Sequence, residues 1–478
     1  MSQYTGTPLR IVIALIAIME PAAAQHYQND FAPAEFRARW SNVFDEIGAN
    51  ALALVQGAGK VRGFNYPRQY NNFFYLSGIE TPHAYLLLDG SNRKVVLFLP
   101  ARDEKLERSE GKMLSAADVD LVKRLTGVDD VRSGAEMTGD WMREFGDENT
   151  KYVYLQFSPS EGLAESRHEI LAANQGIVDD PWDGRAPREA QFLQLMQLRN
   201  PHLEVRNLTP VMDVLRTIKS AGEIALVRRA SQLAGLGLME AMRSTEPGVF
   251  EFQLDAAARY IFLLNGARLE GYRSITASGT QNINNGHYFR NDRKMQDGDM
   301  VLMDFAPDYH YYVSDVGRMW PVNGTFNAWQ RELLGFVLSY HKAILQRIRP
   351  GVTPQDILDE VSEVMEAEFD RVRFSKPIYE VAARRMVSTG GGAFSHTVGM
   401  AVHDVGHYIS GVLQPGLVFS VDPQLRVPEE DLYLRYEDTV VVTDDGVENF
   451  TDFLPMELDE IEALVQEKGI VQLIPPAH

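Results

Sequence analysis

Acidic and imidazole side chains occur at four places in the second half of the chain, on or beside stretches that otherwise read as apolar strands. They are Asp304 with Asp315, His396 with His403, Asp422, and Glu437. Charged groups are rarely buried unless they are paired or bind a metal, so their presence in such stretches needs a reason. Carboxylates and imidazoles together form the donor set of a divalent-metal site.

The first place predicts a pair of opposed carboxylates. Strands at Val301–Phe305 and Tyr312–Asp315, joined by a tight turn centred between Tyr309 and His310, would set Asp304 directly across from Asp315. Carboxylates in that position repel each other unless a cation lies between them. Two Asp residues eleven apart are nevertheless common in an acidic chain.

The other three places also have plainer interpretations. A histidine such as His396 in a small, apolar stretch is more often a hydrogen-bonded core residue than a ligand. The Asp422-Pro423 pair is typical of a turn. A charge such as Glu437 in an apolar strand is usually exposed, or here paired with Arg435.

Composition excludes several functions. The 46 basic and 66 acidic residues leave a net charge of −20, which disfavours a nucleic-acid-binding surface without a segregated basic patch, and none is visible. Cysteine is absent, which excludes disulfides, thiolate metal sites and cysteine nucleophiles. With 478 residues, 45% of them hydrophobic, the chain is long enough for two or three domains.

Hydrophobic patterning predicts two domains. The first 200 residues alternate between a helix at Ala34–Ile47 and short strands at Ala51–Val55, Ala84–Leu88 and Val95–Leu99. We place the boundary near Arg206–Ile218. Beyond it, Ser220 and Glu223 form a capping box at the start of a helix. The expected elements that follow are a helix at Glu251–Asn265, strands around Met300, Val313 and Val418, and one long strand from Leu432 to Val442.

The amino terminus has the pattern of a secretory signal peptide. Ile11–Met19 is apolar, Arg10 precedes it, and the small residues Ala22, Ala23 and Ala24 follow, which predicts a leader at residues 1–24 with cleavage after Ala24. The protein would then be secreted or periplasmic, and cytoplasmic if the leader is not cleaved. Glu20 near the cleavage point also fits a buried strand or helix start. No other stretch is apolar enough for stable membrane insertion.

Taken in order, the four places resemble the pita-bread metallopeptidase family of creatinase, aminopeptidase P and prolidase. The resemblance rests on the spacing of Asp304 and Asp315, on His396 seven residues before His403 in a stretch ending His-Asp-Val-Gly, and on Glu437 within Arg-Tyr-Glu-Asp. More loosely, residues 71–78 look like the amino-terminal domain of aminopeptidase P, which favours the proline-directed branch.

This resemblance implies an α/β (α+β) chain with a pita-bread catalytic domain at residues 215–470. A smaller, creatinase-like α/β domain at residues 30–205 precedes it. The implied activity is hydrolysis of the Xaa-Pro bond at peptide amino termini, closest to Xaa-Pro aminopeptidase. The implied partner is a peptide with proline at its second position, and relatives are usually homo-oligomers.

The resemblance also implies roles for particular residues. Two divalent ions, with Mn favoured and Co or Zn possible, would be bound by Asp304, Asp315, His396, Asp422 and Glu437, with Asp315 and Glu437 bridging. His287 and His403 would contact the peptide group and steady the tetrahedral intermediate, and Asp422 would also act as general base. Tyr272, Arg426 and Arg435 would contact substrate.

Three departures from the family pattern leave alternatives open. Asp422 stands where the family has Glu, Gly392 where it usually has His, and Gln424-Leu425-Arg426 where it has Gly-Leu-Tyr. The altered pocket leaves room for a prolidase-type dipeptidase or for a hydrolase of another amide or C–N bond. A non-catalytic peptide-binding module is a further alternative, although such modules typically lose ligand residues.

Overall fold

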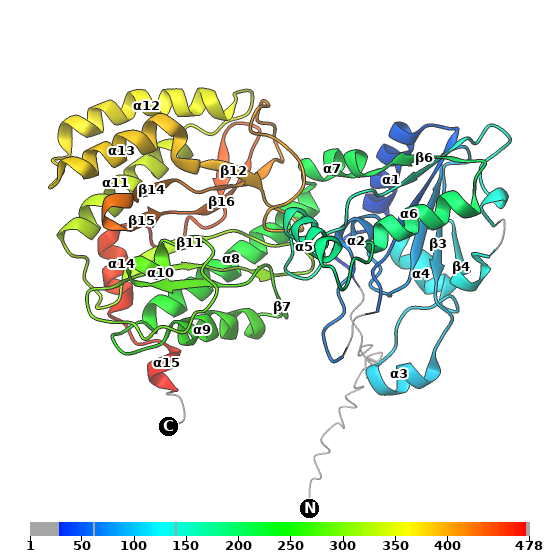
Figure 1. Cartoon of the computed structure of the whole chain (residues 1–478), viewed down its shortest axis with the longest axis horizontal. Coiled ribbons are helices and arrows are strands. Elements are labelled where there is room, and N and C mark those ends of the chain that lie inside the picture. Colours follow the sequence, from blue (N-terminus) through cyan, green and yellow to red (C-terminus); the bar gives the residue numbers. More distant parts are fainter. Residues whose placement is uncertain (1–27, 61–62, 139–140, 475–478) are drawn as a thin grey trace, which may run out of the picture.

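The structure is a computed structural model that describes residues 28–60, 63–138 and 141–474. These residues form two parts that lie side by side (Figure 1), with α7 (Thr209–Thr217) between them and α8 (Ala221–Arg243) in the carboxyl-terminal part. The predicted leader at residues 1–24 lies outside the described residues. No helix in the described ranges is long and apolar enough to cross a bilayer.

The amino-terminal part is built on a six-stranded sheet in the order β4-β3-β2-β1-β5-β6. Strand β2 pairs antiparallel with both β1 and β3, whereas β4 pairs in parallel with β3, β5 with β1, and β6 with β5. The strands are β1 (Ala51–Gln56), β2 (Tyr85–Asp89), β3 (Lys94–Leu99), β4 (Asp130–Ser133), β5 (Tyr152–Leu155) and β6 (Glu204–Asn207). Its helices are α1 (Pro33–Ile47), α2 (Asn71–Ser77), α3 (Glu104–Glu110), α4 (Val119–Thr126), α5 (Arg167–Asp179) and α6 (Arg188–Arg199).

Strand β1 shows why this sheet is apolar on both faces. Ala51, Ala53 and Val55 pack in one core cluster with α1, while Leu52 and Leu54 pack on the other face with Trp141 and Met196. Successive side chains of a strand point to opposite faces, so a strand covered on both sides reads as a continuous apolar run. The predicted helix and three strands of this region are confirmed to within two residues.

The carboxyl-terminal part contains several small antiparallel sheets between two layers of helices. In Figure 1, α8 and α9 lie on one side of the strands, and α11, α12 and α13 lie on the other. The sheet orders are β11-β9-β8, β12-β13-β16-β17, β14-β15 and β10-β7. The helices are α9 (Glu251–Leu264), α10 (Gly279–Ile283), α11 (Ala328–Leu345), α12 (Pro354–Arg371), α13 (Pro377–Thr389), α14 (Leu458–Val465) and α15 (Ile470–Leu473).

The strands of this part are short and mostly buried. They are β7 (Leu269–Glu270), β8 (Ile275–Ser278), β9 (Met300–Asp304), β10 (Pro307–Asp308), β11 (Gly317–Pro321), β12 (Phe394–Thr397), β13 (Val418–Val421), β14 (Gln424–Val427), β15 (Leu432–Arg435), β16 (Asp438–Val442) and β17 (Val447–Asn449). Short 3₁₀ turns occur at Gly134–Glu136, Trp141–Glu144, Gly390–Gly392 and Pro428–Glu430. The predicted capping box is confirmed, because the Ser220 hydroxyl accepts from the Glu223 N–H and the Glu223 carboxylate accepts from the Ser220 N–H.

The predicted register between the two aspartates is wrong by two residues. Asp304 pairs with Gly317, so Asp315 lies just before β11, and no strand forms around Val313. The connection is not a simple hairpin, because β10 leaves it to pair with β7. The turn itself closes between Tyr309 and Tyr312.

The predicted long strand from Leu432 to Val442 is also wrong, because it is divided. Strand β15 pairs with β14, whereas β16 pairs with β13. Glu437 lies at the break, and its backbone exchanges hydrogen bonds with that of Gly317 at 3.1 and 3.3 Å. Because of this break, residues 432–442 contribute strands to two sheets, and Glu437 lies where the two sheets meet.

Candidate metal centre

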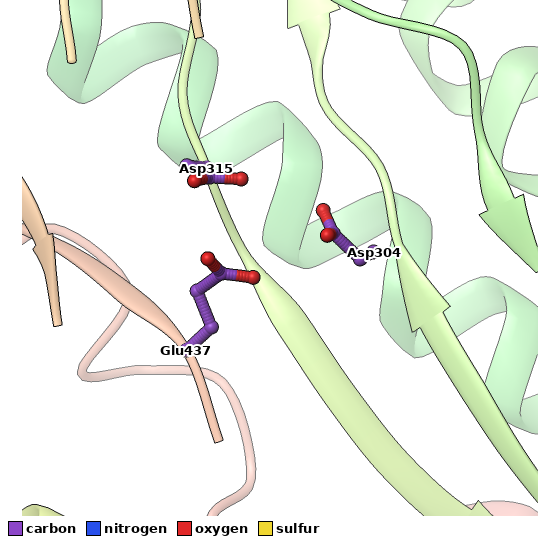
Figure 2. A group of neighbouring side chains, drawn as sticks. All are labelled: Asp304, Asp315 and Glu437. Atoms are coloured by element: carbon purple, nitrogen blue, oxygen red, sulfur yellow. The ribbon is translucent and has the colours of Figure 1, made fainter. Parts of the chain in front are cut away.

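Three carboxylates from different strands converge in the carboxyl-terminal part. Asp304 ends β9, Asp315 precedes β11, and Glu437 lies between β15 and β16. One carboxylate oxygen of each lies within 4.8 Å of the others, and the residues are 4%, 3% and 1% exposed. Figure 2 shows the three side chains directed toward a common centre. This arrangement makes them candidate ligands of a shared cation.

The backbone around these carboxylates is held firmly by β16. The Thr439 hydroxyl accepts a hydrogen bond from the Asp315 N–H and donates one to the Asp315 carbonyl, both at 2.8 Å. The Ser420 hydroxyl on β13 donates to Glu437 Oε1 at 3.0 Å. The positions of the carboxylates are therefore fixed by neighbouring strands.

The two other predicted ligands lie at the edge of this group. His396 Nε2 is 3.3 Å from Asp315 Oδ2, and Asp422 follows β13 with only 5% of its surface exposed. Asp422 is linked to the others by Arg435, whose Nε is 3.1 Å from Asp422 Oδ1. The structure thus brings all five predicted ligands into one region, and carboxylate oxygens of three of them lie within 4.8 Å of one another.

Arg435 is placed at the centre of the carboxylates. Its guanidinium is 2.7 Å from Asp304 Oδ2 and also contacts Glu437. The plainer interpretation of Glu437 is half right, because this side chain is paired with Arg435 but is buried. Contact between Arg435 and substrate stays a prediction.

The carboxylates are electrostatically unbalanced. Burial and the neighbouring Glu437 raise the pKa of Asp304 to about 7, and the same causes raise the pKa of Asp315 well above its usual range. Burial likewise raises the pKa of Asp422. Glu437 has a lowered pKa despite its burial, because Arg435 lies beside it. The Arg435 guanidinium thus favours ionisation of Glu437, but it does not balance the negative charge of Asp304, Asp315 and Asp422.

Three imidazoles surround that of His403, and one of them, His396, lies beside Asp315. The centre of the His403 ring is 4.2 Å from that of His396, 5.0 Å from that of His168 and 6.3 Å from that of His287. Burial and these three neighbours lower the pKa of His403 to about 3. At neutral pH this ring is uncharged, so it can donate from one nitrogen and accept at the other.

The loop that carries His403 is anchored by the amino-terminal part. Its Asp404 is bound by Arg216 at 2.5 Å and lies 3.3 Å from Lys219. Asn71, in the motif at residues 71–78, donates to the Met400 carbonyl at 2.9 Å. The His403 N–H donates to the hydroxyl of Ser166, which precedes α5, at 3.1 Å. Residues far apart in sequence therefore set the position of the His403 ring.

The predicted substrate residues differ in their surroundings. The Tyr272 hydroxyl donates to Asp304 Oδ1 at 2.5 Å, so in this structure it orients a candidate ligand. Arg426 is exposed on β14, with its guanidinium 4.0 Å from the centre of the Tyr433 ring. His287 is exposed and lines a cavity of about 730 Å³. The carboxylates do not line that cavity.

Sequence reasoning missed two residues of this region. His168 lies on α5, in the other part of the chain, and a single exposed histidine there carries no pattern. Gln424 donates from Nε2 to Asp422 Oδ2 at 2.6 Å. The departure of Gln424 from the family pattern was the available signal for this contact.

Comparisons with known proteins agree with this geometry. The model of "Metallopeptidase family M24" matches residues 225–444, and that of "Aminopeptidase P, N-terminal domain" matches residues 36–154. The Xaa-Pro aminopeptidase of Escherichia coli (strain K12) is 30% identical over 466 residues, covering 90% of this chain and 97% of that protein. The chain belongs to metallopeptidase family M24. The predicted family and enzyme class are thereby confirmed.

Solved structures support the same fold. A putative aminopeptidase P from Bacillus anthracis matches with a TM-score of 0.75 at 24% identity, covering 92% of this chain and all of that one. E. coli aminopeptidase P, solved with the inhibitor Pro-Leu and in a zinc-substituted form with product, matches with a TM-score of 0.72 at 28% identity, over 91% of this chain and 98% of that one. The predicted pita-bread catalytic domain behind an aminopeptidase P-like domain is confirmed.

Proposed function

We propose that this chain is a metal-dependent aminopeptidase that hydrolyses the bond between an amino-terminal residue and a following proline. The observation that carries the proposal is the convergence of Asp304, Asp315 and Glu437, with His396 and Asp422 beside them. Similarity to Xaa-Pro aminopeptidases over nearly the whole chain supports the choice of substrate.

The donor set fits two divalent cations. Asp304, Asp315, Asp422 and Glu437 would supply four negative charges, and His396 would supply a neutral nitrogen. The buried carboxylates with raised pKa values, and the Asp422 oxygen without a hydrogen bond, are what such ions would satisfy. Bound there, two cations supply Lewis acidity toward the scissile carbonyl and lower the pKa of a water.

The remaining residues position the peptide. His403 is uncharged and half-buried, so its N–H can hydrogen-bond to a carbonyl oxygen that gains negative charge during attack. His287, whose ring centre lies 6.3 Å from that of His403, would contact the peptide group. Asp422, close to the other carboxylates, would accept a proton from the attacking water.

Finer features of the proposal rest on chemistry and sequence. Manganese is the proposed ion, because oxygen donors with one imidazole suit it well, and cobalt or zinc are alternatives. Export is proposed from the apolar run Ile11–Met19 followed by Ala22, Ala23 and Ala24. A homo-oligomer is proposed from the family resemblance.

Activity assays on defined peptides test the proposal. Metal-stripped protein should not cleave Xaa-Pro tripeptides, and added Mn(II) should restore cleavage, with the free amino-terminal residue as product. Matched peptides with alanine in place of proline are the control. Equal cleavage of both sets would contradict the proline-directed assignment and favour another amide hydrolase.

A dipeptidase is the second candidate, favoured by Arg426. Arg426 lies two residues after Gln424 on β14, so the two side chains are on the same face of the strand. The exposed guanidinium of Arg426 stacks on the Tyr433 ring. A cation there could bind the free carboxylate of an Xaa-Pro dipeptide. Dipeptides cleaved faster than tripeptides at equal concentration would select this candidate.

A further inference from the structure

The two carboxylate oxygens of Asp422 have different surroundings. Oδ2 accepts a hydrogen bond from Gln424 Nε2 at 2.6 Å. Oδ1 has no hydrogen-bond donor among the described residues, because Arg435 Nε, although 3.1 Å away, is not aligned for a hydrogen bond. Asp422 is only 5% exposed. Oδ1 therefore has an ion-pair contact with Arg435 but no hydrogen bond, and it is the oxygen of Asp422 that a metal ion would satisfy.

The backbone fixes Gln424 beside this carboxylate. Gln424 is the first residue of β14 and pairs directly with Arg435 of β15, so both side chains emerge on the same face of the two-stranded sheet. A half-buried amide in that place is neutral, and it can bind Asp422 without competing for the charge of the carboxylate.

Gly392 lies next to the Gln424 amide. A Cβ at Gly392 would lie 3.7 Å from Gln424 Cδ and 3.8 Å from Nε2, which is ordinary van der Waals contact. Gly390, Gly391 and Gly392 all have positive φ angles, which L side chains rarely adopt. Two departures from the family pattern, at positions 392 and 424, thus lie close to each other and to the third, Asp422.

We infer that Gln424 is a positioning residue that holds Oδ2 of Asp422 and thereby directs Oδ1 toward the metal ions. The inference rests on the proposed function for the presence of metal. Aspartate is one methylene shorter than glutamate, so its carboxylate needs a fixed orientation to reach a shared cation. Groups that hydrogen-bond to a metal ligand orient it, and their loss typically lowers metal affinity by about 10- to 100-fold.

The primary test is Mn(II) binding to metal-stripped full-length protein, measured by competition with a chromophoric chelator. Gln424→Leu removes the donor and keeps the bulk, and it should weaken one of two sites by about tenfold or more, with thermal unfolding of the stripped protein unchanged. Gln355→Leu is the matched control, because Gln355 Nε2 donates to Asp359 at 2.8 Å on exposed α12, far from the site in sequence. The control should bind Mn(II) as the parent does.

A double-mutant cycle separates orientation from mere packing. Asp422→Glu alone should bind Mn(II) poorly, because the longer side chain meets Gln424. Asp422→Glu combined with Gln424→Gly should recover affinity, so the two changes should be strongly non-additive. Additive effects would overturn the inference, as would parental Mn(II) affinity in Gln424→Leu.

Failure of this inference can be distinguished from failure of the proposed function. Two Mn(II) sites in the parent, one weakened in Gln424→Leu, uphold the inference even if no Xaa-Pro peptide is cleaved. Cleavage of Xaa-Pro peptides with parental affinity in Gln424→Leu upholds the function and overturns the inference. A parent that binds no Mn(II) overturns the inference outright.

Discussion

Glu437 and Asp438 are consecutive, almost fully buried residues with opposite electrostatic surroundings. Glu437 faces Asp304 and Asp315. Asp438 is bound by Arg318 at 2.6 Å and by His341 at 2.7 Å, and also by the Thr451 hydroxyl. Successive side chains of a strand point to opposite sides, so one segment supplies two different ionic clusters.

The clusters around Glu437 and Asp438 differ in their balance of positive and negative charge. Around Glu437, four carboxylates share the single guanidinium of Arg435, and three of them have raised pKa values. Around Asp438, one carboxylate has a cation and an imidazole, which lower its pKa to about 2 despite burial. A cluster that is balanced internally stabilises the fold, whereas a cluster short of positive charge is suited to bind a metal ion.

The largest effect is expected from removing charge on the side of Glu437. Glu437→Gln and Asp315→Asn should each lower kcat/KM on an Xaa-Pro tripeptide by about a thousandfold or more, as expected when a group that stabilises the transition state is lost. The stripped Asp315→Asn variant should unfold at the same or a higher temperature than the stripped parent, because the pKa of Asp315 is raised by neighbouring negative charge. Parental activity in either variant after exhaustive chelation would remove the basis for a metal mechanism.

Substitution of Asp438 is expected to lower stability and to leave metal binding unchanged. Asp438→Asn should lower the free energy of unfolding by about 3–5 kcal/mol, because it leaves Arg318 buried without its carboxylate. Mn(II) stoichiometry should stay at the parental value. Chemical denaturation and metal analysis of the same preparation check both points. Loss of metal without loss of stability would mean that the two clusters are not independent.

The pH dependence of stability should have opposite signs for the two clusters. Asp304 has a raised folded pKa of about 7, so the metal-free fold should gain stability as pH falls from 7 toward the usual aspartate range. Asp438 has a folded pKa of about 2, so its contribution is complete above the ordinary value of 3.8 and is lost as pH falls through 2. Melting curves of metal-free protein across this range measure both slopes. A metal-free protein equally stable at all pH values above 4 would contradict the raised pKa of Asp304.

The smallest effect on activity is expected from substitution of Arg426, which lies outside the carboxylate group. Arg426→Tyr should shift preference from dipeptides toward longer Xaa-Pro peptides by about tenfold, which is about 1.4 kcal/mol, with metal content unchanged. The ratio of kcat/KM for a dipeptide and a pentapeptide measures this shift. If this ratio is the same in Arg426→Tyr and in the parent, Arg426 stacks on Tyr433 without contacting the substrate.

Local sequence patterns predicted the elements but not all of their partners. The stripe of Phe36, Trp40 and Phe44 and the Ser220–Glu223 capping box have signals within one element, so α1 and α8 were predictable. The register of Asp304 was not, because the detour through β10 depends on pairing with β7, about 40 residues earlier.

The candidate ligands were predicted from the resemblance to a known family, whereas their surroundings were not predicted. Arg435 among three carboxylates and His168 beside His403 depend on segments brought together from distant parts of the chain. The hydrophobic periodicity of a sequence gives no information on such long-range contacts. Gln424 was visible only as a departure from a pattern, and its contact with Asp422 needed the structure.

Calorimetric titration of metal-stripped protein with Mn(II), with Xaa-Pro hydrolysis assayed on the same samples, tests the central claim most directly. The account predicts about two ions bound per chain, with activity that rises as the sites fill. It also predicts that Glu437→Gln loses binding while Asp438→Asn keeps it. Hydrolysis that continues without bound metal, or parental binding in Glu437→Gln, would contradict the account.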